Sequence, residues 1–466
     1  MLKKRLLIYL GLLLLPVVGA FAQYSIHYTL KNLPDSKVYL TSIRGSRYVP
    51  IDSCVAKKGV IQFNVTPSMP VGVYRIVFAD SLFTDVILNH ENIVITNDMS
   101  DLLDNMQVIE SHENAFYYSY WHLSSYINDS IQLISVLGDR IYQSSQHVMT
   151  SDLDSMARKA YQLTQTLNAF TNQLIEKSRG MFVNKLLKAY TVPDWEAYKK
   201  LPNAQTYKKR SDFLRSHFFD NIDFADTTLL YSEIFYVSCT DYLTDYVSVP
   251  SDTSYIKAVD FILSKPAENS PVYNYILNLL VNTFSDTEWE GTFVHLVDAY
   301  LEKNTCDQSP HNKTMSERAA VIHKLKPGNA APEILMNDAD GKPCSLFALK
   351  SKVVLLIFWS SECLHCEEVM AQICQLYDTY KSLGLEIFAV SADTDKAKWM
   401  EALHKNKMTW VNVCDLLGFQ SPTIENYNAY STPTFFVLDA QKTIVAHPYS
   451  PKEMSESINR AFNLQH

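Results

Sequence analysis

The chain has 466 residues, of which 47% are hydrophobic and 20% are charged, a composition typical of a folded protein with more than one compact core. Its formal net charge of −9 gives no electrostatic reason to bind nucleic acid or an anionic membrane surface. We therefore expect several domains and no nucleic-acid partner.

The N-terminus has the pattern of an export signal. Three basic residues at positions 3–5 precede an apolar run over residues 6–18, and an Ala-Phe-Ala tripeptide follows at residues 20–22. These are the parts of a secretory signal peptide. The run of 13 residues is shorter than the roughly 20 that span a bilayer, so an uncleaved anchor is the weaker interpretation. We expect residues 1–22 to be removed and the mature chain to begin at Gln23, in the periplasm or cell envelope.

Residues 23–100 form the first predicted domain. Short runs of apolar residues alternate with polar ones, as at Tyr24, Ile26, Tyr28 and Leu30. A period of two, interrupted by turn sequences, is typical of half-buried strands. Roughly six or seven such strands predict a small all-β, sandwich-like domain.

Residues 101–324 form the second predicted domain, and here the period becomes helical. Apolar residues recur at helical spacing, for example at Leu123, Ile127, Ile131 and Ile134. This spacing predicts an α-helical domain. Aromatic residues such as those at 116–121 more often form a core than a ligand-binding platform. Neither of the first two domains shows a catalytic constellation.

Residues 325–466 form the third predicted domain, in which short β runs alternate with helical stretches. The continuous apolar run at residues 353–358 is typical of a strand that is buried on both faces. Residues 367–380 carry apolar side chains on one helical face. Strands separated by such helices predict an α/β domain with right-handed crossovers.

The main chemical motif is Cys363-Leu364-His365-Cys366, the only pair among the eight cysteines at a chemically meaningful interval. It follows a predicted strand and opens a helix, so the first sulfur faces unpaired backbone N–H groups and the positive end of the helix dipole. Both effects lower a thiol pKa, and the thiolate is the species that attacks a disulfide. Cys363 is therefore the predicted nucleophile, Cys366 the resolving thiol, and protonated His365 would favour the thiolate.

Several further stretches carry a specific similarity, at residues 331–333, 340–343, 355–359, 390–393, 410–415 and 430–439. With the cysteine pair, they make residues 326–466 resemble the TlpA/ResA-like branch of the thioredoxin superfamily, the envelope thiol–disulfide oxidoreductases. The resemblance implies a thioredoxin-like fold and exchange with protein thiols and disulfides. It also implies a cis-proline at Pro433, with the backbone of Thr432 presented to the substrate, and a membrane protein as electron donor or acceptor.

The sequence departs from the family pattern around the motif. Glu362 stands where the family usually has Trp directly before the first cysteine, while Trp359 directly follows the predicted strand. Val369 and Ile357 occupy positions where relatives carry acidic residues. The proton acceptor for the resolving thiol therefore stays open between Glu362, two further glutamates in the following helix and a water molecule. A carboxylate beside the first cysteine would also raise its thiol pKa.

We interpret the chain as a periplasmic thiol–disulfide oxidoreductase, with reduction of protein disulfides favoured over oxidation or isomerisation. A peroxiredoxin-like peroxide reductase is a weaker alternative, because Ser360 stands where that chemistry uses Thr. A third alternative is an envelope binding or scaffold protein with a vestigial redox domain. Zinc would need two more ligands near the cysteines, so neither a metal nor a cofactor is expected. The substrates, the redox partner and the oligomeric state stay open.

Overall fold

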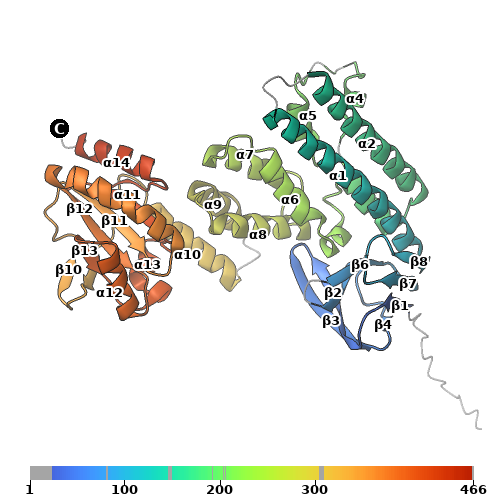
Figure 1. Cartoon of the computed structure of the whole chain (residues 1–466), viewed down its shortest axis with the longest axis horizontal. Coiled ribbons are helices and arrows are strands. Elements are labelled where there is room, and N and C mark those ends of the chain that lie inside the picture. The colour runs from blue at the N-terminus through green and yellow to red at the C-terminus, as the bar shows by residue number, and fades with distance from the viewer. Residues whose placement is uncertain are drawn as a thin grey trace, which may run out of the picture. The chain divides into compact units, whose positions relative to one another are not determined.

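The computed structural model describes residues 24–79, 82–144, 150–191, 193–202, 204, 206–303 and 309–463. The predicted signal peptide, residues 1–22, lies outside the described residues. The chain divides into two compact units, Met1–Ser248 with Ser264–Ile276, and Val249–Leu263 with Leu277–His466. Figure 1 colours the chain from blue at the N-terminus to red at the C-terminus. The predicted domain boundaries at residues 100 and 324 stay predictions.

In the described part of the first unit, eight strands form two four-stranded sheets. One sheet has the order β4-β1-β7-β8: β1 (Tyr24–Lys31), β4 (Val60–Val65), β7 (Ile93–Asp98) and β8 (Gln107–Glu110). The other has the order β3-β2-β5-β6: β2 (Ser36–Arg44), β3 (Arg47–Ala56), β5 (Gly72–Ala79) and β6 (Leu82–Leu88). The buried Tyr28 and Thr84 hydroxyls join the two sheets by a 3.2 Å hydrogen bond. The predicted β-rich region is confirmed.

A partly buried ion pair ties two strands of the second sheet together. Arg75 on β5 lies opposite Asp85 on β6, and its guanidinium donates to both carboxylate oxygens at 2.7 and 2.9 Å. Burial raises the pKa of Asp85, and the charge of Arg75 opposes that rise. The guanidinium also lies 3.7 Å from the ring centroid of Phe83. Both charges are thus satisfied within the sheet.

Strand β3 forms one edge of the second sheet. Its pairing with β2 shifts register between Leu40 and Thr41, and Pro50 stands opposite Thr41. Val49 and Ile51 on this edge strand are 52% and 42% exposed. Because proline has no backbone N–H, it is tolerated in sheets mainly at such edges and bulges.

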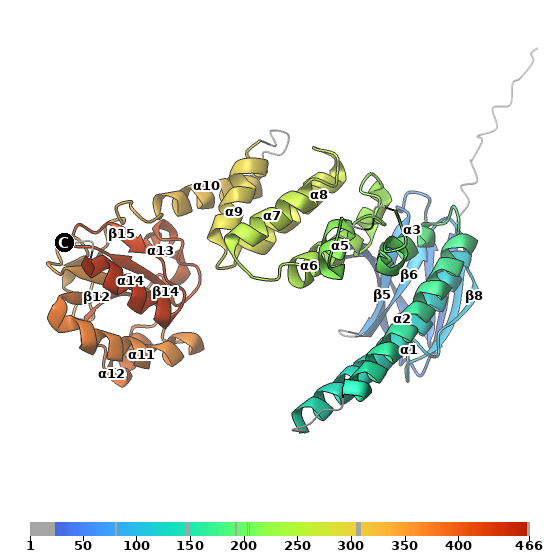
Figure 2. The same ribbon diagram turned by 90° about the horizontal axis from the view of Figure 1, so that it is seen from above.

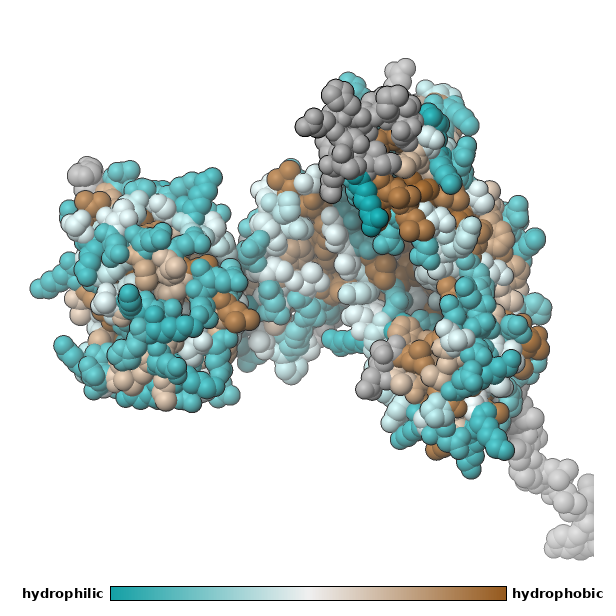
Figure 3. Space-filling model, in the orientation of Figure 1, coloured by the Kyte–Doolittle hydropathy of each residue, from teal (hydrophilic) through white to brown (hydrophobic). Residues whose placement is uncertain are grey.

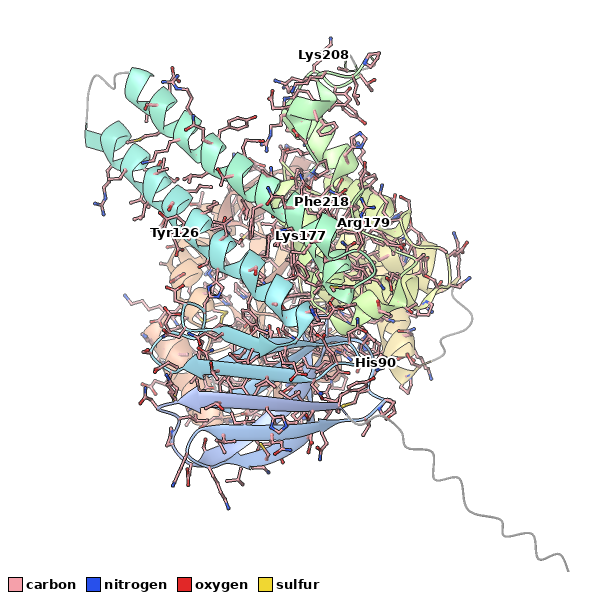
Figure 4. The ribbon with its side chains drawn as sticks, turned by 90° about the vertical axis from the view of Figure 1, so that its right-hand side faces the viewer. His90, Tyr126, Lys177, Arg179, Lys208 and Phe218 are labelled. Atoms are coloured by element: carbon pink, nitrogen blue, oxygen red, sulfur yellow. A yellow bond between two sulfur atoms is a disulfide. The ribbon has the colours of Figure 1, made fainter. Side chains whose placement is uncertain are left out.

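The helices of the first unit confirm the predicted change of period after the strands. They are α1 (His112–Ser144), α2 (Thr150–Lys177), α3 (Phe182–Ala189), α4 (Trp195–Tyr198), α5 (Arg210–His217), η1 (Thr227–Tyr231) and α6 (Ile234–Asp245). Figure 4 shows α1 and α2 side by side, with Tyr126 labelled on α1. Tyr117, Tyr118 and Tyr120 are buried near the start of α1, so these aromatic residues belong to a core.

The second unit begins with helices. These are α7 (Asp252–Leu263), α8 (Pro271–Ser285), which crosses the boundary between the units, α9 (Glu290–Leu296), η2 (Val297–Leu301) and α10 (Pro310–Lys324). The Asp252 carboxylate accepts hydrogen bonds from the backbone N–H and the hydroxyl of Thr292 at 2.7 and 2.8 Å. This contact ties the start of α7 to α9. No helix within the described ranges is both long and apolar enough to cross a membrane.

The rest of the second unit is the predicted α/β domain, with a five-stranded sheet in the order β13-β12-β11-β14-β15 among its described residues. The strands are β11 (Val353–Trp359), β12 (Leu385–Ser391), β13 (Val411–Val413), β14 (Thr434–Leu438) and β15 (Ile444–Ala446), preceded by the hairpin β9 (Leu335–Asn337) and β10 (Pro343–Ser345). Strands β11, β12 and β13 are parallel, whereas β14 and β15 are antiparallel to their neighbours.

Helices and short helical turns cover both faces of this sheet (Figures 1 and 2). They are α11 (Leu364–Tyr380), η3 (Lys381–Leu383), α12 (Lys396–Lys405), η4 (Gly418–Gln420), α13 (Pro422–Asn426) and α14 (Pro451–Asn463). Every residue of β11 is buried, with Leu355 facing the core that contains α11 and Leu356 facing the other. Hydrophilic residues cover much of the visible surface of this domain (Figure 3). The predicted thioredoxin-like fold is confirmed.

Candidate active site

The cysteine motif lies where β11 ends and α11 begins. Cys363 is the N-cap residue of α11, and the backbone N–H of Cys366 donates to its sulfur at 3.1 Å. The sulfur thus takes the place that a serine or aspartate oxygen takes in most N-caps. Because the backbone N–H groups and the helix dipole act on this atom, a thiolate is favoured there.

The two cysteines of the motif form a disulfide, with their Cα atoms 5.3 Å apart. Cys363 is partly exposed, whereas Cys366 is 1% exposed and lies in the core beside α11. A substrate sulfur can therefore reach Cys363 more readily than Cys366. This asymmetry is the one that a nucleophilic and a resolving thiol require.

A loop before β14 lies against the motif. The Thr432–Pro433 peptide bond is cis, as the family resemblance implies. The carbonyl oxygen of Thr432 lies 3.3 Å from the sulfur of Cys363. Since β14 pairs directly with β11, the sheet itself brings this loop to the cysteines.

A buried aspartate organises the loop that precedes Cys363. Asp393 is 5% exposed and follows β12. Its carboxylate accepts hydrogen bonds from Ser360 Oγ at 3.0 Å, Ser361 N at 3.0 Å and Ser361 Oγ at 2.8 Å. Ser391 Oγ donates a further bond of 2.6 Å. The carboxylate therefore fixes the path of the chain between β11 and Cys363.

Sequence reasoning did not single out Asp393, although a signal was present. Parallel strands β11 and β12 are neighbours, so their carboxyl ends meet at one edge of the sheet, where sites of α/β domains form. A Ser-x-Asp segment over residues 391–393 stands at that edge. A polar residue that closely follows a buried strand is therefore a sequence signal for a site residue.

Two glutamates beside the cysteines are paired with lysines of α12. Glu362, directly before Cys363, forms an ion pair with Lys398, and Glu367 forms one with Lys405. The hydrogen bond and charge of each glutamate raise the pKa of its lysine. The Glu362 carboxylate therefore does not act unopposed on the Cys363 thiol. Sequence reasoning missed both lysines.

The other predicted supporting residues differ in exposure. Trp359 is 1% exposed and packs in the core beside α11. The His365 side chain is 67% exposed, and its Nδ1 lies 3.4 Å from the Glu368 carboxylate. Its imidazole therefore stands at the surface beside the disulfide. No cluster of three metal-ligating side chains occurs within the part of the chain that the structure describes.

A groove of about 930 Å³ opens beside the first cysteine. Cys363 and Thr432 line it together with Asp393 and Lys398. Phe419, which is 47% exposed, contributes an apolar wall. Cys363 is thus accessible from this groove.

Comparison with known proteins adds to this geometry. Residues 327–447 match the AhpC/TSA family. Residues 24–117 and 195–287 match two domains of unknown function, DUF4369 and DUF5106. These last two matches carry no chemistry.

Curated relatives match the C-terminal part of the chain. The thiol-disulfide oxidoreductase ResA of Bacillus cereus (strain ZK / E33L) is 32% identical over 124 residues, which cover 26% of this chain and 69% of the relative. ResA of Bacillus thuringiensis subsp. konkukian (strain 97-27) is 30% identical over 122 residues, with the same coverage. The chain belongs to the TlpA/ResA-like family of thiol–disulfide oxidoreductases. Membership confirms the predicted enzyme class.

A longer match comes from a solved structure. A thioredoxin-like protein from Bacteroides caccae ATCC 43185 is 20% identical, and the match covers 58% of this chain and 98% of that one with a TM-score of 0.44. The family assignment depends on the ResA relatives, which match about a quarter of the chain.

Proposed function

We propose that Cys363 and Cys366 are the redox centre of this oxidoreductase and that it reduces disulfides of protein substrates. The observation that carries the proposal is the position of the Cys363 sulfur as the N-cap of α11, partly exposed, with Cys366 buried one turn further along. A helix N-terminus lowers the pKa of such a thiol. The reactive thiolate and its resolving partner are thus set apart by exposure.

The proposed reduction has two steps. In the dithiol form, the Cys363 thiolate attacks one sulfur of a substrate disulfide, so that a mixed disulfide forms and the other substrate sulfur leaves as a thiolate that takes up a proton. Cys366 then loses its proton and attacks the Cys363 sulfur, which breaks the mixed disulfide. The second substrate thiol leaves, two electrons have passed to the substrate, and the enzyme disulfide remains.

Neighbouring residues have supporting roles in this proposal. The backbone of Thr432, next to the cis Pro433, would pair with the extended substrate segment beside the Cys363 sulfur. Asp393 keeps the preceding loop in shape through its serine and backbone hydrogen bonds. His365, when protonated, would favour the thiolate from its exposed position.

The proposed location is the periplasm or cell envelope. The basic, apolar and small-residue segments at residues 3–22 support export. A disulfide reductase in an oxidising compartment needs a steady supply of electrons. A membrane protein that offers a dithiol would supply them by the same exchange chemistry. Fractionation, together with the N-terminal mass of the purified protein, tests the location, and a mature chain that begins at Gln23 is expected.

The reduction potential of the cysteine pair in glutathione buffers tests the direction, with Cys363→Ala as control. A value well below about −200 mV, near the roughly −270 mV of thioredoxin, supports a reductase. A value near about −120 mV would make the protein an oxidant of folding proteins. If there is no two-electron couple, the proposed redox centre is wrong and a scaffold role is favoured.

The peroxiredoxin-like alternative is weaker. Peroxide reduction would use the residue at 360 to activate the nucleophile, but Ser360 Oγ donates to the Asp393 carboxylate at 3.0 Å. The hydroxyl proton is thus engaged by the Asp393 carboxylate. Hydrogen peroxide added to the dithiol form, with thiol loss followed over time, separates the two chemistries.

A further inference from the structure

A second groove, of about 360 Å³, lies on the other side of the cis-proline loop. Thr432, Pro433 and His365 form one side of it, and the helical segment forms the other with Asp286, Thr287, Glu288, Glu290 and Arg318. Its volume falls within the range of ligand-binding pockets. The groove thus joins the surroundings of the disulfide to a part of the second unit outside the thioredoxin-like sheet.

The far wall of this groove is fastened to the cis-proline loop by Asn428. The Asn428 amide donates to Glu290 Oε1 at 3.0 Å and its oxygen accepts from Arg318 Nε at 2.7 Å. The Arg318 guanidinium also lies 5.4 Å from the ring centroid of Tyr430. The His447 side chain, 15% exposed, has its Nδ1 3.3 Å from a carboxylate oxygen of Glu290. These bonds hold α9 and α10 against the loop that presents Thr432.

The groove carries an excess of negative charge. Its described lining residues include three carboxylates, of Asp286, Glu288 and Glu290, and one guanidinium, of Arg318. The imidazoles of His365 and His447 also line it and carry charge only when protonated. Arg318 forms an ion pair with Asp286 at 3.1 Å. Glu288 is exposed at the rim. Burial, followed by the negative charges of Glu290, Asp252 and Glu288, raises the pKa of Tyr449, which also lines the groove, in agreement with a negative potential there.

We propose that this groove binds the polypeptide segment that flanks the reacting cysteine of a substrate, and that it prefers a segment with lysine or arginine near that cysteine. This inference rests on the proposed exchange at Cys363. A substrate chain whose sulfur meets Cys363 and whose backbone runs along Thr432 continues into the groove. A basic side chain there meets the carboxylates of Asp286 and Glu288. Fields of this kind act mainly on the rate of association.

The test uses the full chain in its dithiol form and three peptides of equal length. Each peptide carries one cysteine in a disulfide with 5-thio-2-nitrobenzoate, whose release is followed by absorbance, and Lys, Gln or Glu two residues from that cysteine. Each rate constant is divided by that for a small disulfide, which reports on the redox centre itself. The expected order is Lys, Gln, Glu, with about a five- to tenfold range at low salt. In 1 M salt, where the Debye length is about 3 Å, the range should shrink below about twofold.

Charge variants assign the preference to the groove. Glu288→Lys should reverse the order of the rate constants for the three peptides. Glu288→Gln should roughly halve the logarithm of the ratio between the fastest and the slowest peptide. Glu317→Gln is the matched control, because Glu317 is a 66% exposed carboxylate on α10 outside the groove lining. It should leave the order of the peptides unchanged.

The remaining outcomes overturn the inference in distinct ways. Equal rates for the three peptides would show that the groove does not read charge, while the proposed redox centre would stand. A lysine preference that survives Glu288→Lys would place the recognition elsewhere on the surface. If neither the peptides nor the small disulfide react, the proposed redox centre fails and the inference fails with it.

Discussion

Asp85 in the N-terminal sandwich, which is partly buried, and Asp393 in the thioredoxin-like domain, which is buried, bind different partners. Asp85 accepts two hydrogen bonds from Arg75 on the neighbouring strand. Asp393 accepts hydrogen bonds from two serines and a backbone N–H of the loop before Cys363. The first carboxylate joins two strands, whereas the second shapes a loop. The element that a buried carboxylate binds, more than its burial, thus indicates whether it supports a site.

The largest expected difference between the two regions concerns their cysteines. Cys363→Ala should lower disulfide exchange by about 10³-fold or more, because it removes the nucleophile. Cys54→Ser on strand β3 is the matched control from the sandwich and should keep the full rate. Exchange with a small disulfide after full reduction measures both. If the two variants lost activity equally, the redox centre would not be confined to the C-terminal domain.

The two aspartates provide the next test. Asp393→Ala should reduce exchange by about 10- to 100-fold, since the freed loop no longer places Cys363, and small misplacements cost about 10² in rate. Asp85→Ala should instead lower the free energy of unfolding by about 2 kcal/mol, because it removes two charged hydrogen bonds to the Arg75 guanidinium, which keeps its 3.4 Å contact with Glu233. Its exchange rate should stay that of the parent protein. Denaturant titration and exchange kinetics on the same samples separate the effects; a slow but fully stable Asp85→Ala variant would contradict the comparison.

Acid should affect the two regions with opposite sign. Although its burial acts in the other direction, contacts with His447, Asn428 and Arg318 lower the pKa of Glu290 in the native state. The unfolded chain therefore binds a proton at this carboxyl first as pH falls below about 5. The stability that Glu290 contributes decreases from there and is lost once pH has fallen past the pKa of Glu290 in the native state. Burial raises the pKa of Asp85, so the native sandwich binds a proton at this carboxyl before the unfolded chain does. The contribution of Asp85 to the free energy of unfolding therefore increases as pH falls.

Hydrogen exchange of Glu290→Gln and Asp85→Asn, measured between pH 6 and pH 4, reads out each region separately. In the C-terminal unit, the free energy of opening of the parent protein should exceed that of Glu290→Gln by less as pH falls. In the sandwich, the free energy of opening of the parent protein minus that of Asp85→Asn should increase with acid. Parallel slopes in both regions would show that these carboxylates do not govern the response.

The smallest expected effect comes from the lysines of α12. Lys398→Gln leaves the Glu362 carboxylate unpaired beside Cys363, which raises the pKa of that thiol and reduces the thiolate fraction at pH 7 by less than about tenfold. The pH dependence of iodoacetamide alkylation measures this change. Since exposed charges are screened, the effect should disappear in 1 M salt. Lys452→Gln on α14 is a matched control, and an equal shift there would indicate a general charge effect.

Local motifs of the sequence predicted the chemistry better than the contacts that support it. The cysteines are three positions apart and their strand and helix are adjacent in the chain, so the pattern alone places both sulfurs. The contact between Ser361 and Asp393 joins residues 32 positions apart, and that between Glu362 and Lys398 joins residues 36 apart. Such contacts depend on the register between β11 and β12 and on how α12 packs, which local periodicity does not specify.

The same limit applies to the fold. Alternation of apolar residues indicated the strands of the sandwich, but the parallel pairing of β1 with β7 joins Ile26 to Ile93, and no local pattern predicts that partner. The cis bond before Pro433 followed from family resemblance, because the residues alone do not distinguish cis from trans. Asn428, with a positive φ of 48°, links the loop to α9 and α10, which sequence reasoning had treated as part of a separate helical region.

The edge strand β3 has a consequence for association between copies of the chain. An open edge lined by Val49 and Ile51 offers backbone groups and apolar side chains to any other extended segment, which is how sheets grow into aggregates. Pro50 interrupts the row of N–H donors, and the shifted register beside it twists the edge. A second molecule therefore cannot add a complete, regular strand at this position. This protection lies in the covalent structure of the strand itself.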